Sequence, residues 1–176
     1  GLLLIDSGGQ YLGGTTDITR VVRIGALTAE QKRDVTVVLK GMIQLSLATF
    51  PRGIKGGLLD ALARAPIWAT LSDYGHGTGH GVGYFLAVHE GPQSISPGAA
   101  ALPHAILEPG MITSNEPGLY RPGRWGVRIE NLVLTVPAGS SFAASCRSAR
   151  RTAASSSVIA RPARFDSPGP RSGNRP

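Results

Sequence analysis

Three of the four histidines of this chain lie in one glycine-rich segment, residues 76–92. His76 and His80 are separated by Gly-Thr-Gly, and His89 follows nine residues after His80. A helix through the glycines at positions 75, 77, 79, 81 and 83 would lose about 1 kcal/mol per glycine relative to alanine. We therefore predict a tight loop that leads into a strand and lets the backbone approach a neighbour closely. Taken alone, the segment is equally compatible with a polar surface turn.

Two aspartates lie near the first predicted turn of the chain. An apolar run at residues 2–5 ends in Asp6-Ser-Gly-Gly, which we interpret as a strand closed by a turn. Residues 15–24 form a second predicted strand with Asp17 inside it, and Gly13-Gly14 predicts a bulge between the two. Such a hairpin would bring Asp6 and Asp17 close together. Turn capping is the simplest interpretation of Asp6, but aspartate is depleted in strands, so Asp17 needs another explanation.

Two glutamates take similar places in the second half of the chain. A short predicted strand at residues 111–114 runs into Glu116, and Glu130 lies in the middle of a predicted strand at residues 126–136. A glutamate inside Val-Arg-Ile-Glu-Asn-Leu-Val is a poor strand residue unless something binds it.

Four carboxylates and one imidazole, each beside glycine or in a β-rich run, form a candidate set of metal ligands: Asp6, Asp17, His80, Glu116 and Glu130. Hard oxygen ligands with one nitrogen suit Mn²⁺, Zn²⁺, Co²⁺ or Fe²⁺, and an oxygen-rich set favours Mn²⁺. Four buried carboxylates would repel one another, and two divalent ions would neutralise them. Two metal ions about 3.5–4 Å apart can activate a water molecule and polarise a carbonyl group.

We expect two predicted helices to pack over the hydrophobic core, and we assign no catalytic or binding role to them. Thr28-Ala-Glu-Gln31 is a capping box that begins an amphipathic helix, which we expect to continue to Phe50 and to end before Pro51. A second helix is predicted over residues 56–68, with Trp68 as a packing residue.

Composition excludes several classes of function. The formal net charge is +7, but seven of the 18 basic residues and one of the 11 acidic residues lie after Cys146. The rest of the chain is nearly neutral, and no aromatic residues interleave with the basic ones, so we expect no nucleic-acid partner. No apolar run is long enough to span a bilayer, so we expect no membrane partner. The single cysteine, Cys146, excludes an internal disulfide and favours a reducing, cytoplasmic location.

Composition changes after residue 136. Residues 137–176 are dominated by Ser, Ala, Arg, Pro and Gly, with no apolar periodicity, which predicts a disordered low-complexity tail. A frame change in the coding sequence, or a truncation, would produce such a tail. The chain also begins without Met, inside a predicted strand, and we expect it to be a fragment.

Five short motifs occur in a fixed order along residues 1–136. They are Asp6-Ser-Gly-Gly-Gln-Tyr, Gly14-Thr-Thr-Asp-Ile-Thr-Arg20, the 76–92 segment, Ser114-Asn-Glu-Pro-Gly118 and Gly126-Val-Arg-Ile-Glu-Asn131. Together they closely resemble the catalytic domain of the X-prolyl aminopeptidases, in the pita-bread metallopeptidase superfamily. Prolidase and methionine aminopeptidase share the ligand pattern, whereas the residues that flank Asp17 and His80 resemble those of the aminopeptidase P branch.

The resemblance implies a role for each metal ligand. It places Asp6 and Asp17 on one metal ion, with Asp17 bridging to the second. It places His80 and Glu116 on the second ion, and Glu130 on both.

The resemblance also implies three catalytic residues around the ligands. His76 and His89 would bind substrate and stabilise the tetrahedral intermediate or carry protons. Arg128 would orient the Asp6 side of the site by a hydrogen bond. His104 matches no motif of the family, and we expect it on the surface.

The resemblance implies an α+β fold, a pita-bread fragment in which helices cover a curved antiparallel sheet. The implied reaction is hydrolysis of the bond between an amino-terminal residue and a following proline. The implied cofactors are two divalent metal ions, with Mn²⁺ favoured over Zn²⁺ and Co²⁺. The implied partners are peptides with proline in second position, and a homodimer for the full-length form. The alternative is a truncated, weakly active or inactive fragment, or a pita-bread binding module.

Overall fold

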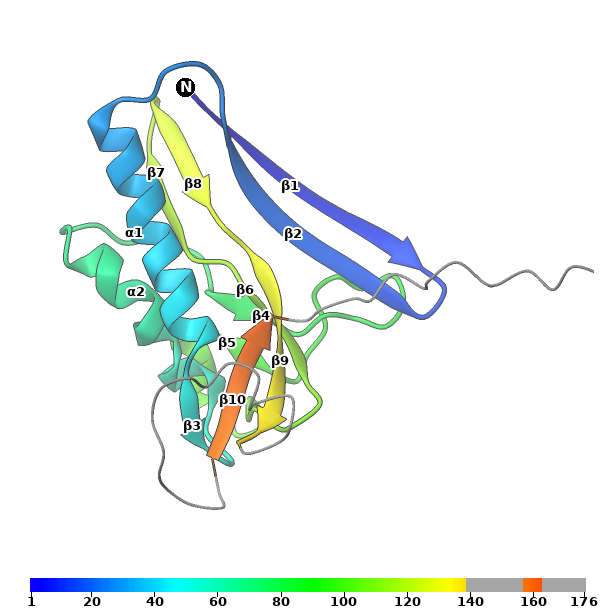
Figure 1. The fold of residues 1–176 in the computed structure, drawn as a ribbon. Coiled ribbons are helices and arrows are strands. Elements are labelled where there is room, and N and C mark those ends of the chain that lie inside the picture. Colours follow the sequence, from blue (N-terminus) through cyan, green and yellow to red (C-terminus); the bar gives the residue numbers. More distant parts are fainter. Residues whose placement is uncertain (139–156, 163–176) are drawn as a thin grey trace, which may run out of the picture.

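The structure is a computed structural model, and it describes residues 1–138 and 157–162 (Figure 1). In the labels below, η marks a 3₁₀ helix. The elements are, in chain order, β1 (Leu2–Tyr11), β2 (Gly14–Arg23), α1 (Ala29–Ser46), β3 (Thr49–Pro51), η1 (Gly56–Leu58), α2 (Asp60–Trp68), β4 (Gly79–His80), β5 (Ser94–Ile95), η2 (Pro97–Ala101), β6 (Ile112–Asn115), β7 (Gly118–Arg121), β8 (Trp125–Arg128), β9 (Asn131–Pro137) and β10 (Ser157–Pro162).

The first two strands form a long, regular hairpin. β1 and β2 pair antiparallel from Leu2 opposite Arg23 to Tyr11 opposite Gly14. The predicted turn at Asp6 and the predicted bulge at Gly13-Gly14 are both wrong, because β1 continues through Asp6 and the register has no insertion. The chain instead reverses at Leu12-Gly13, where Gly13 has a φ of +110° that favours glycine.

The two helices pack against each other beside the strands. α1 begins at the predicted capping box, in which the Thr28 hydroxyl accepts the Gln31 N–H and the Gln31 side chain accepts the Thr28 N–H. α1 ends at Ser46 rather than near Phe50, because residues 49–51 join a sheet as β3. The second predicted helix is divided into η1 and α2, and Pro66 lies inside α2.

The described strands pair antiparallel throughout. One sheet has the order β3-β10-β9-β6, and three further pairs are β1-β2, β4-β5 and β7-β8. The predicted strand at 126–136 is interrupted: β8 ends at Arg128 and β9 begins at Asn131. The two residues between them include Glu130, whose N–H donates to the Thr19 carbonyl of the hairpin at 3.1 Å. The break therefore ties the hairpin to the rest of the molecule.

The tail contains one strand that composition did not predict. Ser157–Pro162 forms β10, which pairs with β9 on one edge and with β3 on the other. The prediction of a structureless tail is wrong for these six residues, since two neighbouring strands offer backbone hydrogen bonds that no composition encodes. The remaining tail residues, 139–156 and 163–176, lie outside the described residues.

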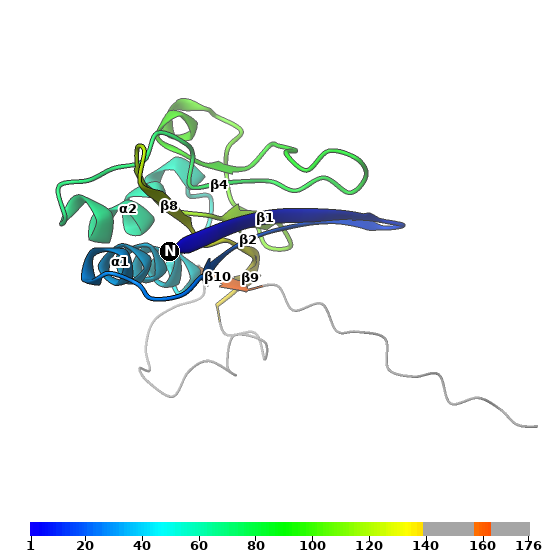
Figure 2. The ribbon, with the colours of Figure 1, turned by 90° about the horizontal axis from the view of Figure 1, so that it is seen from above.

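Two buried apolar clusters hold the described part together, and both involve α1. The first lies among α1, α2 and the β3-β10-β9-β6 sheet, and consists of Leu45, Ala48, Phe50, Leu59, Ala63, Ile95, Leu107 and Val133. The second joins α1 to the β7-β8 pair, and consists of Val37, Val38, Ile67, Tyr74, Leu119 and Val127. Both helices lie on the same side of β7 and β8, and the far end of the β1-β2 hairpin projects away from them (Figures 1 and 2). Neither described helix is long and apolar enough to cross a membrane.

Candidate metal centre

The register of the hairpin places two of the predicted ligands on one face. Asp6 lies opposite Thr19 and Gly8 lies opposite Asp17, so Asp6 and Asp17 are diagonal neighbours across the strand pair. One ligand oxygen from each of Asp6, Asp17 and Glu130 lies within 4.8 Å of the others. The hairpin therefore brings its two aspartates to the glutamate at the β8–β9 break.

A second group forms around the histidine of β4. His80 Nε2 lies 3.1 Å from Glu116 Oε1 and 3.5 Å from Asp17 Oδ2. Its other ring nitrogen, Nδ1, lies 2.9 Å from the Gly81 carbonyl, which can only accept, so Nδ1 carries a proton and Nε2 is the ring nitrogen that faces the carboxylates. Ser114 fixes both partners, since its hydroxyl accepts the His80 N–H and donates to Glu116 Oε1, each at 2.9 Å.

The close approach of β4 and β6 depends on glycine. A Cβ on Gly79 would lie 2.0 Å from the Ser114 carbonyl oxygen, which no side chain can do without moving the backbone. The predicted close approach in the glycine-rich segment is thus found at Gly79. The predicted strand there is short, because β4 covers only Gly79–His80.

Glu130 is the most buried of the predicted ligands, at 1% exposure. Thr19 donates a hydrogen bond to its Oε2 at 2.6 Å, while Oε1 has no hydrogen-bond partner among the described residues. Burial, reinforced by the charges of Glu116, Asp17 and Asp6, raises the pKa of Glu130 to about 7. Burial also raises the pKa of Asp17, against the opposing effect of His80.

These features fit divalent metal ions. One ligand group is Asp6, Asp17 and Glu130, the other is His80, Glu116 and Glu130, and the two share Glu130. The unpartnered Oε1 of Glu130 and the raised pKa values are what clustered carboxylates show when no cation neutralises them. Five donors, four of them carboxylates, suit a hard or borderline divalent cation.

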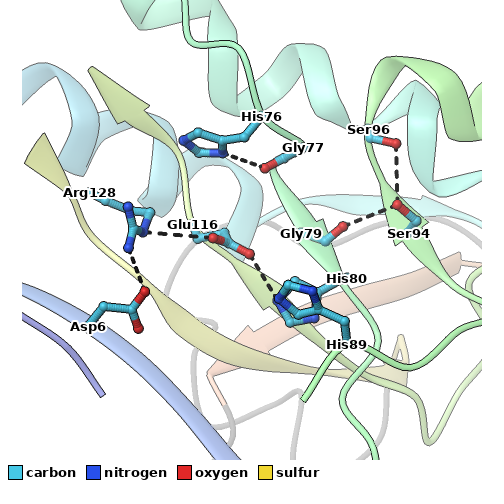
Figure 3. A pocket seen from close by; sticks show the side chains of 10 residues that line it. All are labelled: Asp6, His76, Gly77, Gly79, His80, His89, Ser94, Ser96, Glu116 and Arg128. Atoms are coloured by element: carbon cyan, nitrogen blue, oxygen red, sulfur yellow. Dashed lines mark hydrogen bonds and ion pairs between the residues drawn. The ribbon is translucent and has the colours of Figure 1, made fainter. Parts of the chain in front are cut away.

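The centre lies at one wall of a pocket of about 560 Å³ (Figure 3). The pocket is lined by Asp6, His76, Gly77, Gly79, His80, His89, Ser94, Ser96, Glu116 and Arg128. All three predicted catalytic residues, His76, His89 and Arg128, are therefore in the pocket with the ligands. His104 is exposed in the loop before β6 and does not line it, as expected.

The hydrogen bond predicted between Arg128 and Asp6 is present. Arg128 Nη2 donates to Asp6 Oδ2 at 2.6 Å, and its Nε donates to the Thr19 hydroxyl at 3.3 Å. Thr19 in turn donates to Glu130. Arg128 therefore contacts Asp6 of one ligand group directly and reaches Glu130, which belongs to both groups, through Thr19.

Tyr120 of β7 is a site residue that sequence reasoning missed. Its hydroxyl lies 2.7 Å from His76 Nε2 and accepts a hydrogen bond from Arg128 Nη1 at 3.1 Å. Its place four residues after Glu116, in Glu-Pro-Gly-Leu-Tyr, was the available signal. Thr19 and Ser114 were missed as well, because a hydroxyl in a β-rich run is ordinary in sequence and becomes informative only through its contacts.

His89 lies at the exposed side of the site. Its ring packs against the His80 ring with centroids 4.0 Å apart, and with His80 and Asp17 it forms a third group of close polar atoms. His89 is thus near the metal ligands but open to solvent, unlike Glu130.

Comparison with known proteins defines the class first. Residues 1–137 match the model of metallopeptidase family M24, and the chain belongs to this family. The predicted family and the pita-bread fold class are thereby confirmed.

Individual relatives show which members of the family this chain is similar to. The chain is 49% identical over 142 residues to Xaa-Pro aminopeptidase 1 of Dictyostelium discoideum, covering 81% of this chain and 22% of the relative. Its structure is similar to X-prolyl aminopeptidase from Caenorhabditis elegans, with a TM-score of 0.78, 38% identity, and coverage of 92% of this chain and 24% of the other. Prolidase from Pyrococcus furiosus gives a TM-score of 0.67 at 35% identity, covering 76% and 38%. The chain thus spans less than a quarter of the first two proteins.

Proposed function

We propose that this chain carries the metal centre of an aminopeptidase that cleaves the bond between an amino-terminal residue and a following proline. The observation that carries the proposal is the pair of ligand groups that share Glu130 at the wall of one pocket. The similar relatives in Dictyostelium discoideum and Caenorhabditis elegans are Xaa-Pro aminopeptidases, and the latter is described as a cytosolic enzyme with a di-nuclear active site. By this likeness we extend peptide substrates, two metal ions and a cytoplasmic location to the present chain.

In this proposal Asp6 and Asp17 would hold one ion, His80 and Glu116 would hold the other, and Glu130, which belongs to both groups, would serve both. Asp17 lies 3.5 Å from His80 and is the second bridging candidate. The bound ions would activate a water molecule and polarise the scissile carbonyl group. The four carboxylates favour Mn²⁺ over Zn²⁺ and Co²⁺.

The remaining pocket residues bind and orient the substrate. His76 Nδ1 lies 2.8 Å from the Gly77 carbonyl, so this nitrogen carries a proton and Nε2 accepts from the Tyr120 hydroxyl. Arg128 holds Asp6 and Tyr120 at once, and so fixes one wall of the pocket. Exposed His89 can donate a hydrogen bond to a substrate carbonyl or carry a proton to solvent.

The described part supports a catalytic unit over residues 1–137, the extent of the family match. Weak activity is the second candidate, because the chain spans 22% and 24% of the two aminopeptidases. Positioned groups outside this span would contribute to turnover, and misplacement of such groups costs on the order of 100-fold in rate. A homodimer of the full-length form stays a prediction.

The test is hydrolysis of an X-Pro dipeptide or tripeptide with added Mn²⁺. We expect turnover by the chain, at a rate below that of a full-length aminopeptidase of this family. Glu116→Gln and His80→Ala should each abolish it, because each removes a ligand, whereas His104→Ala, outside the pocket, should leave it unchanged. Turnover that survives Glu116→Gln, or that needs no divalent metal, would contradict the proposal.

A further inference from the structure

A buried arginine lies behind the histidine-bearing segment without lining the pocket. The Arg64 side chain, on α2, is 4% exposed and uses all three of its nitrogens. Nε donates to Asp60 Oδ2 at 2.6 Å, and Nη1 donates to Asp73 Oδ1 at 2.8 Å. Nη1 also donates to the Tyr74 carbonyl and Nη2 to the His76 carbonyl, both at 2.7 Å. One guanidinium thus holds two backbone carbonyls of the segment that carries His76.

The same guanidinium reaches the segment through side chains. Its carbon lies 3.8 Å from the centre of the Tyr74 ring, and the Tyr74 ring lies 4.8 Å from the His76 ring. The Thr78 hydroxyl donates to Asp60, so the Tyr74 hydroxyl must donate to Thr78. Residues 74–78 are therefore fixed to α2 at both ends of the turn.

Beyond the hydrogen bonds to α2, this segment is held mainly at its ends: Tyr74 packs in the second apolar cluster, and the Thr78 backbone is hydrogen-bonded to Ile95 and Glu116. Residues 72–78 belong to no helix or strand, and Gly75 and Gly77 have no side chains with which to pack. A buried ion pair is no efficient means to general stability, because apolar replacements of similar volume are often neutral or stabilising. A fork of donors that matches two carbonyls and two carboxylates instead specifies one backbone geometry.

We propose that Arg64 is a positioning residue that sets the orientation of the His76 ring in the pocket. The inference rests on the proposed function for its catalytic meaning. The path is short: Arg64 holds the His76 carbonyl, the backbone places the Gly77 carbonyl, and that carbonyl accepts from His76 Nδ1. His76 Nε2 is thereby directed at the Tyr120 hydroxyl, which Arg128 also contacts.

The substitution Arg64→Lys separates the effect of the positive charge from the effect of the guanidinium geometry. Arg64→Lys keeps the positive charge near Asp60, four residues away on the same helix. A single ammonium group on a flexible chain cannot reproduce the planar fork, so the carbonyls of Tyr74 and His76 lose their common donor. Arg121→Lys is a matched control, because Arg121 also forks onto a buried aspartate, Asp34, by two hydrogen bonds of 2.9 Å, with no recorded contact to residues 74–78.

The readout is the tautomer of His76, followed by ¹⁵N NMR of the four histidine rings in the metal-free chain. In the unsubstituted chain His76 should show a protonated Nδ1 and an unprotonated Nε2. Arg64→Lys should move both nitrogen signals toward the average of the two tautomers, while exposed His104 stays unchanged. Arg121→Lys should leave the His76 signals in place even where it lowers the melting temperature equally.

Unchanged His76 signals in folded Arg64→Lys, or an equal change in Arg121→Lys, would overturn the proposal. If Arg64→Lys does not fold, Asp73→Ala takes its place, because the Asp73 side chain is 56% exposed yet holds both Arg64 and the Tyr74 N–H. Its His76 signals should move in the same direction by a smaller amount, and unchanged signals would again refute the role.

A kinetic measurement links this role to the reaction. In this chain, Arg64→Lys should lower kcat by about 10- to 100-fold with little change in KM, as for other misplaced groups. An unchanged kcat alongside altered His76 signals would refute the catalytic meaning. Absence of peptidase activity in the unsubstituted protein would refute the proposed function alone, since the NMR result does not depend on turnover.

Discussion

Single residues at this site carry a stability cost that only a ligand would offset. Glu130 is almost fully buried, its Oε1 has no partner among the described residues, and burial, reinforced by neighbouring carboxylates, raises its pKa to about 7. A buried polar group without a partner costs about 1–3 kcal/mol, and more when it is charged. We interpret Glu130 as a residue retained for binding rather than for folding.

Replacing that glutamate should therefore stabilise the metal-free chain. At pH 8, Glu130→Gln removes a buried negative charge and supplies an amide that can donate to neighbouring carboxylates. We expect the free energy of unfolding without metal to rise by about 1–3 kcal/mol, measured by urea denaturation. Glu108→Gln, in an exposed pair with Arg52, should change it by less than about 0.5 kcal/mol. A metal-free Glu130→Gln variant less stable than the unsubstituted chain would show that Glu130 is a structural residue.

For a second buried carboxylate, which lies outside the pocket, we predict the opposite effect: its removal should destabilise the chain. Asp34 of α1 is 1% exposed in its side chain and accepts from Arg121 and from Trp125 Nε1. Burial alone would raise its pKa, but these hydrogen bonds hold the pKa below the ordinary 3.8. The ionised form therefore stabilises the fold above about pH 4, and this contribution disappears as the pH falls through the lowered pKa.

The corresponding substitution is Asp34→Asn. At pH 7 it should lower the free energy of unfolding by about 3 kcal/mol, because it removes the buried carboxylate to which Arg121 donates two hydrogen bonds. The difference from the unsubstituted chain should shrink when denaturation is repeated near pH 3. A difference that is the same at both pH values would show that Asp34 acts through packing and not through its charge.

At the scale of elements, the site depends on how closely β4 lies against β6. His80 comes from β4, Ser114 from β6 and Glu116 from the residue after β6, so their contacts follow from this approach. The Glu116 N–H also donates to the Thr78 carbonyl at 2.8 Å, which continues the same alignment. Gly79 is the residue that permits it.

Gly79→Ala should accordingly damage both stability and metal binding. The new Cβ would meet the Ser114 carbonyl at 2.0 Å, so β4 must move away from β6. We expect a loss of about 1–3 kcal/mol in the free energy of unfolding. We also expect metal affinity to weaken by about 10- to 100-fold, as when supporting contacts are lost, measured by titration calorimetry. Gly98→Ala, with open space at its Cβ, is the control. Full metal affinity in Gly79→Ala would show that the spacing of these strands does not set the site.

The sequence predicted the identity of the site better than the extent of its elements. The structure brings all five proposed ligands and the three residues predicted around them close together, and their roles stay predictions. The carboxylates were noticed because such residues are unusual in strands, whereas His76, His89 and Arg128 were predicted from the family resemblance. The length of β1 was missed, since Ser7-Gly8-Gly9 reads as a turn until β2 pairs with it. Tyr120 and β10 were missed because their roles come from partners distant in sequence: His76 and Arg128 for one, β3 and β9 for the other.

At the scale of the whole molecule, the metal centre draws its ligands from segments that lie far apart in the sequence. Its ligands come from the hairpin, from β4, from the residue after β6 and from the β8–β9 break, at positions from 6 to 130. Both apolar clusters involve α1, whereas the projecting end of the hairpin lies away from the helices (Figure 2). Hydrogen bonds of Thr19, Arg20 and Arg128 hold the hairpin against the β8–β9 break, and Leu2 and Val21 pack against the second cluster. Bound ions would add to these contacts at the aspartates of the hairpin.

The most direct test of this account is the number of Mn²⁺ ions that the chain binds, measured by equilibrium dialysis with elemental analysis. Two ligand groups that share Glu130 predict two ions per chain. His80→Ala should leave one ion, held by Asp6, Asp17 and Glu130, and Glu130→Gln should leave none bound tightly. A single ion in the unsubstituted chain, or two ions in His80→Ala, would contradict a shared two-metal centre.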